Sequence, residues 1–168
     1  KKRQNLMFSA TMPPKIRELM RDVLVDPFEI SIAMSKPAEG VTQQIYLAHN
    51  DQKIGLVAEI LSQHKEFSSI LIFSSSKKNI SVIVRSLSQK GHPAKGISSD
   101  LEQKEREQVL ADFRSRKTRL LVATDVLSRG IDIKEIDLVI NFDAPMNAED
   151  YVHRVGRTAR SESKGMAI

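Results

Sequence analysis

Leu120-Leu121-Val122-Ala123-Thr124-Asp125 is the most strand-like stretch of this 168-residue chain. Its apolar first four residues predict a buried strand, and the polar pair Thr124-Asp125 would then sit at the carboxyl end of that strand. Short, continuously apolar strands are typical of parallel sheets, because helices cover both faces of such sheets. The stretch therefore favours an α/β fold.

The same pattern repeats outward along the chain from Val41, where short apolar runs alternate with amphipathic segments. Strands are expected at 44–49, 69–73, 93–97, 120–123, 138–142 and 165–168, and helices at 51–64, 77–90, 100–116 and 148–160, with Asp100 as the N-cap of the third helix. This alternation predicts a mainly parallel sheet with helices on both faces.

Polar turns follow three of the expected strands. They are Ser74-Ser75-Ser76, Ser98-Ser99-Asp100 and Thr124-Asp125. In open α/β sheets, ligands bind just beyond the carboxyl ends of the strands. We therefore expect these three turns to share one edge of the sheet, and that edge is the candidate working surface.

The first 40 residues have a different pattern of expected strands and helices from the rest of the chain. A strand is expected at 6–9, a helix at 13–24 and a strand at 28–33, and the turn-rich segment 35–40 follows. We place a domain boundary there, with residues 1–35 belonging to a first domain, 36–42 forming a linker, and 43–168 forming the main domain.

Composition excludes several classes of protein. Hydrophobic residues make up 40% of the chain and charged residues 28%, without an apolar run long enough to span a membrane or to form a signal sequence. The sequence contains no cysteine, and its four histidines are scattered, so neither a disulfide nor a metal site is expected. We expect a soluble, cytoplasmic protein, and its net charge of +5 is compatible with a polyanionic partner.

The segment from Tyr151 to Arg160 gathers cationic side chains. If it is helical, His153, Arg157 and Arg160 share one face, because they are spaced i, i+4 and i+7, while Arg154 points elsewhere. An arginine side chain can bind phosphate through two parallel hydrogen bonds. The most specific function for a pair such as Arg157 and Arg160 is that of arginine fingers, which complete a phosphoryl-transfer site. The alternative is a solvated basic helix face.

The segment from Ala123 to Asp132 contains polar side chains that suit two different groups of a nucleotide ligand. The hydroxyl of Thr124 suits a sugar-phosphate backbone, whereas the carboxylate of Asp132 suits a ribose hydroxyl. Gly130 permits close backbone approach or a positive φ. The alternatives are a helix-cap or turn role for Asp132 and a surface ion pair for Arg129.

Five stretches, in order, resemble motifs of the DEAD-box family of ATP-dependent RNA helicases. They are Ser9-Ala10-Thr11, the strand and turn 71–76, Gln103 with Arg106, 124–132, and 153–160. Together they span essentially the whole chain. The main domain is similar to the second of the two RecA-like domains in that family, and Ser9-Ala10-Thr11 is similar to a motif at the end of the first.

This resemblance implies a three-layer α/β/α RecA-like fold and a set of site residues. The implied RNA contacts are Ser74, Ser75, Ser99, Arg106, Thr124 and Asp125. ATP would meet Gly130, Asp132, Arg157 and Arg160, the last two as catalytic arginine fingers. Coupling between the domains would involve Ser9, Thr11, His153 and Arg154.

The sequence departs from the family pattern in three places. Ala159 stands where glycine is usual, which is compatible with a helix. Ile97-Ser98-Ser99-Asp100 replaces a His-Gly-Asp pattern, although serine still hydrogen-bonds phosphate. Neither a Gly-x-x-x-x-Gly-Lys-Ser/Thr loop nor an Asp-Glu-Ala-Asp sequence occurs.

These last absences predict a split active site. ATP with Mg²⁺ would be bound mainly by a first RecA-like domain outside this chain, of which residues 1–35 are a remnant, and the main domain would be truncated at its C-terminal end. We expect a monomer that binds single-stranded or short duplex RNA with little sequence preference. Two other hypotheses are a non-catalytic RNA-binding or protein-docking module and a DNA-directed helicase of the same superfamily.

Overall fold

The computed structural model of the chain describes residues 3–9, 12, 14–30, 40–125, 136–158 and 165–168. The chain divides into two compact units, Lys1–Ser35 and Lys36–Ile168. None of the helices in these described ranges is both long and apolar enough to cross a membrane.

The described residues of the first unit contain one helix, α1, which spans Pro14–Val23 and buries none of its residues. Phe8 and Phe28 are each 90% exposed. The strands expected at 6–9 and 28–33 are not formed at 6–9 or 28–30, and residues 31–33 lie outside the described part. A strand needs a hydrogen-bonded neighbour, and the sheet found in the described residues contains only segments of the second unit.

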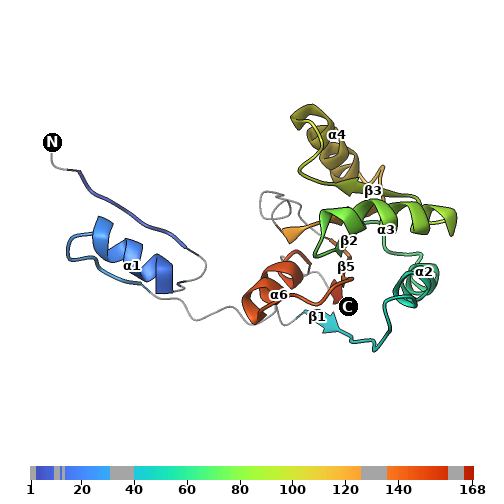
Figure 1. The fold of residues 1–168 in the computed structure, drawn as a ribbon, viewed down its shortest axis with the longest axis horizontal. Helices are drawn as coiled ribbons and strands as arrows, with labels where there is room; N and C mark the ends of the chain where they lie inside the picture. The colour runs from blue at the N-terminus through green and yellow to red at the C-terminus, as the bar shows by residue number, and fades with distance from the viewer. Residues whose placement is uncertain (1–2, 10–11, 13, 31–39, 126–135, 159–164) are drawn as a thin grey trace. The chain divides into compact units, whose positions relative to one another are not determined.

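The second unit is built around a parallel sheet in the order β1-β6-β5-β2-β4-β3 (Figure 1). Its strands are β1 Val41–Gln43, β2 Ile70–Phe73, β3 Ala94–Ile97, β4 Leu120–Ala123, β5 Leu138–Asn141 and β6 Gly165–Ala167. The helices in its described residues are α2 Lys53–Gln63, α3 Lys77–Gln89, α4 Gln103–Arg114 and α6 Ala148–Val155.

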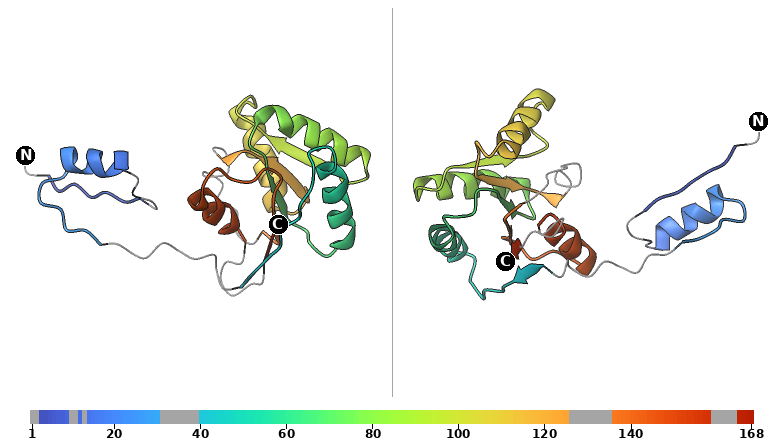
Figure 2. Two further views of the ribbon diagram at one scale, coloured as in Figure 1. Left: turned by 60° about the horizontal axis from the view of Figure 1, so that its bottom comes forward. Right: turned by 180° about the vertical axis from the view of Figure 1, so that it is seen from behind.

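The sheet lies between two layers of helices (Figure 2). Helices α2 and α3 pack on the face that carries Ile70 and Ile72 of β2. Leu71 and Phe73 point to the opposite face, where Phe113 of α4 covers them. All four residues of β2 and of β4 are buried, which explains why both strands are uniformly apolar. The α/β three-layer prediction is therefore confirmed.

The prediction of a strand at residues 44–49 is wrong. The strand β1 is Val41–Gln43 instead, so residues 41 and 42 of the expected linker belong to the sheet. Pairing between β1 and β6 lasts three residues. Residues 44–49 have no regular structure, and Ile45 and Leu47 are 90% and 99% exposed.

Two predicted helix ends also need correction. Helix α4 begins at Gln103 with Glu102 as its N-cap, because the Glu105 carboxylate accepts a hydrogen bond from the Glu102 N–H at 3.2 Å. Asp100 is not the cap. Its carboxylate lies 2.8 Å from the ammonium of Lys77, in an ion pair between the turn after β3 and the first residue of α3.

Helix α6 ends at Val155, short of the predicted end at Arg160. The chain turns at Gly156 and Arg157, and Thr158 then forms a parallel bridge with Ile136, whose carbonyl also accepts a hydrogen bond from the Thr158 hydroxyl. Arg157 thus lies beyond the helix and, contrary to the prediction, does not share a helical face with His153. Arg160, the third residue of that predicted face, lies outside the described part of the chain.

Candidate functional site

The three polar turns lie at one edge of the sheet, as the sequence predicts. Phe73, the last residue of β2, is paired in register with Ala123 of β4, and Ala123 is paired with Ile97 of β3. Because these strands are parallel and end together, the residues that follow them emerge side by side. On its other side Phe73 is paired with Asn141, so the turn after β5 joins the same edge.

The turn after β2 is organised by Asp143, which follows β5. Its Oδ2 accepts hydrogen bonds from the Ser74 hydroxyl at 3.1 Å, the Ser75 N–H at 2.9 Å and the Ser75 hydroxyl at 3.0 Å. Its Oδ1 accepts from the Lys53 ammonium, at the start of α2, at 3.3 Å. One carboxylate therefore fixes both the backbone and the side chains of this turn.

The pKa of the Asp143 carboxyl reflects two opposing effects. Burial raises it, but the hydrogen bonds from the Ser75 backbone, the Ser75 hydroxyl, Lys53 and Ser74 outweigh burial, so the pKa lies below its ordinary value of 3.8. Asp143 is therefore ionised at neutral pH, and all of its hydrogen bonds are accepted ones.

The three serines of this turn have different environments. Ser74 is completely buried, so its side chain does not reach a ligand in this conformation. Ser76 is the N-cap of α3, and its hydroxyl accepts a hydrogen bond from the Lys78 N–H at 3.2 Å. Ser75 is exposed. Of the two residues predicted here for RNA contact, Ser75 alone presents its side chain at the surface.

Arg154 is buried at the centre of the edge, with 3% of its surface exposed. Its Nε and Nη2 donate to the two carboxylate oxygens of Asp125, each at 2.7 Å. Its Nη1 donates to Asn141 Oδ1 at 3.1 Å and to the Asp143 carbonyl at 2.7 Å, and its guanidinium lies over the Phe73 ring at 5.1 Å.

Arg154 therefore joins the turns after β4 and β5 to helix α6. These partners of its guanidinium all belong to the second unit. The resemblance, by contrast, predicted that Arg154 takes part in coupling between the two domains. The Asp125 carboxylate, predicted to contact RNA, is likewise held by Arg154, while the neighbouring Thr124 is partly buried at the end of β4.

The remaining predicted RNA residues lie around the end of β3. Ser99 is exposed in the turn after that strand. Arg106, in the first turns of α4, donates to Gln103 Oε1 and to the Leu101 carbonyl, each at 3.4 Å. Its Nε is buried without a hydrogen-bond partner within the described ranges.

The predicted nucleotide residues are described only in part. Arg157 is partly buried in the turn after α6, and its N–H donates to the Arg154 carbonyl at 3.2 Å. His153 is partly buried in the last turn of α6. Ser9 is exposed in the first unit. Four predicted residues lie outside the described part of the chain: Thr11, Gly130, Asp132 and Arg160.

The exposed serines at this edge, Ser75 and Ser99, suit hydrogen bonding to the sugar-phosphate backbone of a nucleic acid. Arg157 is a permanently charged guanidinium, which fits a polyphosphate such as that of ATP. The described ranges contain no group of three His, Cys, Asp or Glu side chains that could hold a metal ion.

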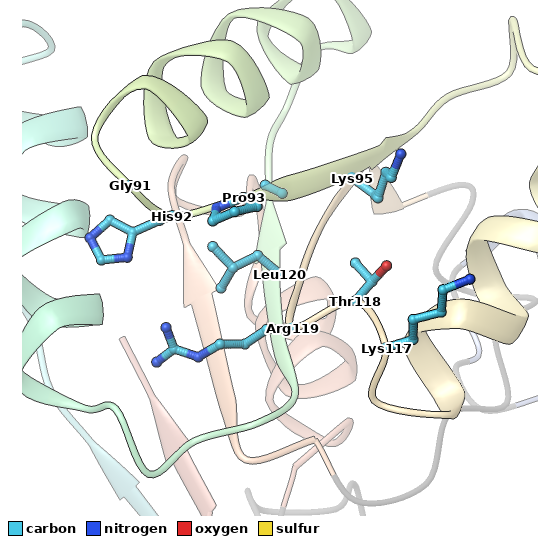
Figure 3. Close-up of a pocket in the computed structure, with 9 residues that line it drawn as sticks. Gly91, His92, Pro93, Lys95, Lys117, Thr118, Arg119 and Leu120 are labelled. Carbon is cyan, nitrogen blue, oxygen red and sulfur yellow. The ribbon is translucent and has the colours of Figure 1, made fainter.

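A cavity of about 340 Å³ lies at the opposite edge of the sheet, next to the amino ends of β3 and β4 (Figure 3). Its polar lining comes from His92, Lys95, Lys117, Thr118 and Arg119. None of the described residues predicted to bind RNA or nucleotide contributes to this lining. The candidate site is therefore the carboxyl edge, not this cavity.

The sequence missed two residues of the site. Asp143 was interpreted only as part of a turn, and Asn141 only as part of a strand. A signal was present for Asp143, since it follows a strand just as Thr124 and Asp125 do. No local pattern indicates that its partners are Ser74 and Ser75, which are 69 and 68 residues away.

The fold and this edge define a RecA-like helicase domain. Residues 52–162 match the family described as the helicase conserved C-terminal domain. The chain is 44% identical over 171 residues to ATP-dependent RNA helicase DBP2 of Eremothecium gossypii, and 40% identical over 168 residues to DEAD-box ATP-dependent RNA helicase 30 of Arabidopsis thaliana. Both alignments cover 99% of this chain, but 30% and 28% of those proteins.

Solved structures agree. Saccharomyces cerevisiae Dbp5 bound to RNA and ADP BeF3 has a TM-score of 0.82 and 29% identity, over 96% of this chain and 43% of that one. Escherichia coli SrmB bound to regulator of ribonuclease activity A has a TM-score of 0.68 and 30% identity, over 76% and 73%. The chain therefore belongs to the DEAD-box family of RNA helicases and contains the C-terminal domain of that family. It spans less than a third of the length of these curated relatives.

Proposed function

We propose that this chain is the part of an ATP-dependent RNA helicase that contacts the RNA backbone and completes the ATPase site. The carboxyl edge of its sheet binds the phosphate and ribose groups of RNA. Support comes from the joint position of Ser75, Ser99 and Thr124 at that edge, together with the family to which the chain belongs.

Arg157 and Arg160 act as arginine fingers in this proposal. They neutralise the charge that develops on the γ-phosphoryl group of ATP, and Asp132 and Gly130 receive the ribose side of the nucleotide. Mg²⁺, when bound, neutralises charge on the same phosphates. Support for this assignment comes from the family to which the chain belongs and from the place of Arg157 in the partly buried turn that follows α6.

The other wall of the ATP site belongs to a first RecA-like domain, and residues 1–35 are part of that domain. Two features support this. The sequence contains neither of the two ATP-binding motifs of that domain, and the first unit exposes large apolar side chains such as Phe8 and Phe28. Hydrolysis then requires closure of two domains, and RNA that contacts both domains favours the closed state.

The test is Arg157→Ala in the full-length protein that carries this chain. We expect RNA-stimulated ATP hydrolysis to fall by about 10³-fold or more while ATP binding is largely retained, because an arginine finger acts on the transition state. Arg114→Ala, an exposed arginine at the far end of α4, is the matched control and should leave turnover unchanged.

The purified chain of residues 1–168 provides the second test. It should bind single-stranded RNA weakly, with a steep dependence on salt, and should hydrolyse no ATP. Turnover by this chain would contradict the split site. Unchanged ATPase in full-length Arg157→Ala would remove the arginine finger, and RNA binding by a full-length protein without ATPase would favour a non-catalytic binding module.

A further inference from the structure

We propose that Asp143 is a positioning residue that turns the Ser75 hydroxyl into a hydrogen-bond acceptor for the ribose 2′-hydroxyl, so that this turn favours RNA over DNA. The proposal rests on the RNA-binding role proposed above for the carboxyl edge. It goes further, because it names the atom that is recognised and the residue that sets the direction of recognition.

The first step concerns the proton of Ser75. A serine hydroxyl has one donor hydrogen and two acceptor lone pairs. The Asp143 carboxylate is ionised and accepts only, and the Ser75 oxygen lies 3.0 Å from its Oδ2. The hydrogen of the Ser75 hydroxyl is therefore directed at Asp143. Because Ser75 is an exposed residue, the lone pairs of its oxygen remain available to accept from a ligand.

The second step concerns the backbone. The Ser75 N–H also donates to Asp143 Oδ2, at 2.9 Å. Two groups of one residue are thus held by one oxygen atom, which restricts both the backbone and the side chain of Ser75. Ser74 donates to the same oxygen from the buried side, and Lys53 holds the other carboxylate oxygen at 3.3 Å. The orientation of the carboxylate is therefore fixed from both sides.

The third step concerns the partner. A phosphate oxygen is itself an acceptor, and it gains nothing from an outward lone pair. A ribose 2′-hydroxyl carries a donor hydrogen, and it is the group that distinguishes RNA from DNA. Base N–H groups also donate, but RNA and DNA share them, so an acceptor fixed at this edge distinguishes RNA from DNA through the 2′-hydroxyl.

The experiment compares the dissociation constants of the full-length protein for one single-stranded RNA and for the DNA of the same sequence, at one salt concentration. Ser75→Ala should weaken RNA binding by about fivefold, the value of one neutral hydrogen bond, and should leave DNA binding unchanged. Asp143→Asn should lower the RNA-to-DNA affinity ratio by a similar factor, because the Ser75 hydroxyl is then free to rotate.

Asp137→Asn is the matched control. Asp137 also holds a serine turn, since its Oδ2 accepts from the Ser68 N–H at 2.7 Å and from the Ser69 N–H at 2.9 Å. That turn precedes β2 and lies at the amino edge of the sheet. Both aspartate variants should lower the thermal midpoint, but Asp137→Asn should leave the affinity ratio unchanged.

The outcomes separate this inference from the proposed function. If the wild-type protein binds no RNA, the proposed function fails. If it binds RNA and DNA equally, or if Ser75→Ala leaves the ratio unchanged, the inference about Ser75 is overturned while RNA binding stands. If Asp137→Asn lowers the ratio as much as Asp143→Asn does, Asp143 has only a structural role.

Discussion

Arg154 is a buried cation whose partners come from three separate strand ends, and its local sequence gives no sign of this. The side chain is 4% exposed and that of its partner Asp125 is 30% exposed. Removing one member of a buried pair leaves the other member and the facing carbonyl without compensation, which is much more costly than losing a surface pair.

We predict that Arg154→Met lowers the free energy of unfolding by about 3 kcal/mol, as measured by urea denaturation. Arg154→Lys should recover only part of this loss, because lysine lacks the forked geometry that reaches both Asp125 oxygens. Lys77→Ala is the control. Its ion pair with Asp100 is more than half exposed on both sides and should contribute less than about 1 kcal/mol. Equal losses of unfolding free energy in Arg154→Met and Lys77→Ala would contradict the structural role of Arg154.

The ionisation of Asp143 should make the stability of the protein depend on pH. Its pKa in the folded protein lies below the ordinary value of 3.8, so its ionised form stabilises the fold fully above that value. This contribution disappears as the pH falls through the lowered pKa. The difference in thermal midpoint between wild type and Asp143→Asn should therefore be largest near neutral pH and shrink as the pH falls below 3.8. A difference that grows on acidification would mean that the pKa is raised instead.

Strand β3 packs directly against helix α3, and Gly96 makes this close packing possible. A Cβ atom at position 96 would lie 2.6 Å from the Cγ2 of Ile80 and 3.3 Å from the Cγ2 of Val84. Ile80 is buried and branched at Cβ, so it has little freedom to move.

Gly96→Ala should therefore destabilise the protein by about 1–3 kcal/mol, because helix and strand would have to separate. Gly55→Ala gives the opposite result. A Cβ at position 55 meets nothing within 4 Å, and alanine in a helix is favoured over glycine by about 0.5–1 kcal/mol. Both free energies come from the same denaturation experiment, and stabilisation by Gly96→Ala would refute this packing.

The two units of the chain differ in how much apolar surface they bury. The second unit contains two clusters of buried residues on the two faces of its sheet. Helix α1 buries none of its ten residues. An isolated helix of that length is marginal in water.

Hydrogen exchange should report this difference. Backbone amides of β2 and β4 should be the most protected, and those of α1 should exchange much faster, because local opening of α1 exposes little apolar surface. A chain that begins at Lys36 serves as the control, and its β2 and β4 amides should keep the same protection. Protection of α1 equal to that of β4 would show that the first unit is stabilised in a way that its own contacts do not explain.

The type and order of the elements of the main domain could be predicted from the sequence. Leu120 to Ala123 forms a strand within its predicted bounds, and the turns at Ser74, Ser98 and Thr124 share one edge. These features follow from local patterns, because an uninterrupted apolar run specifies a buried strand and parallel strands end together. The end of α6, by contrast, depends on the bridge between Thr158 and Ile136, which the local helical pattern does not contain.

Local patterns in the sequence were sufficient to predict the buried central strands β2 and β4 and the chemical groups that follow them at the carboxyl edge. The roles of those groups depend on contacts between distant segments: Ser74 turns inward, Arg154 holds Asp125, and Asp143 holds Ser75 from 68 positions away. The two kinds of feature differ in how far apart in the sequence the interacting residues lie. Periodicity reports the burial of a segment through its own residues, whereas the direction of a hydrogen bond depends on a partner that only the folded chain brings near.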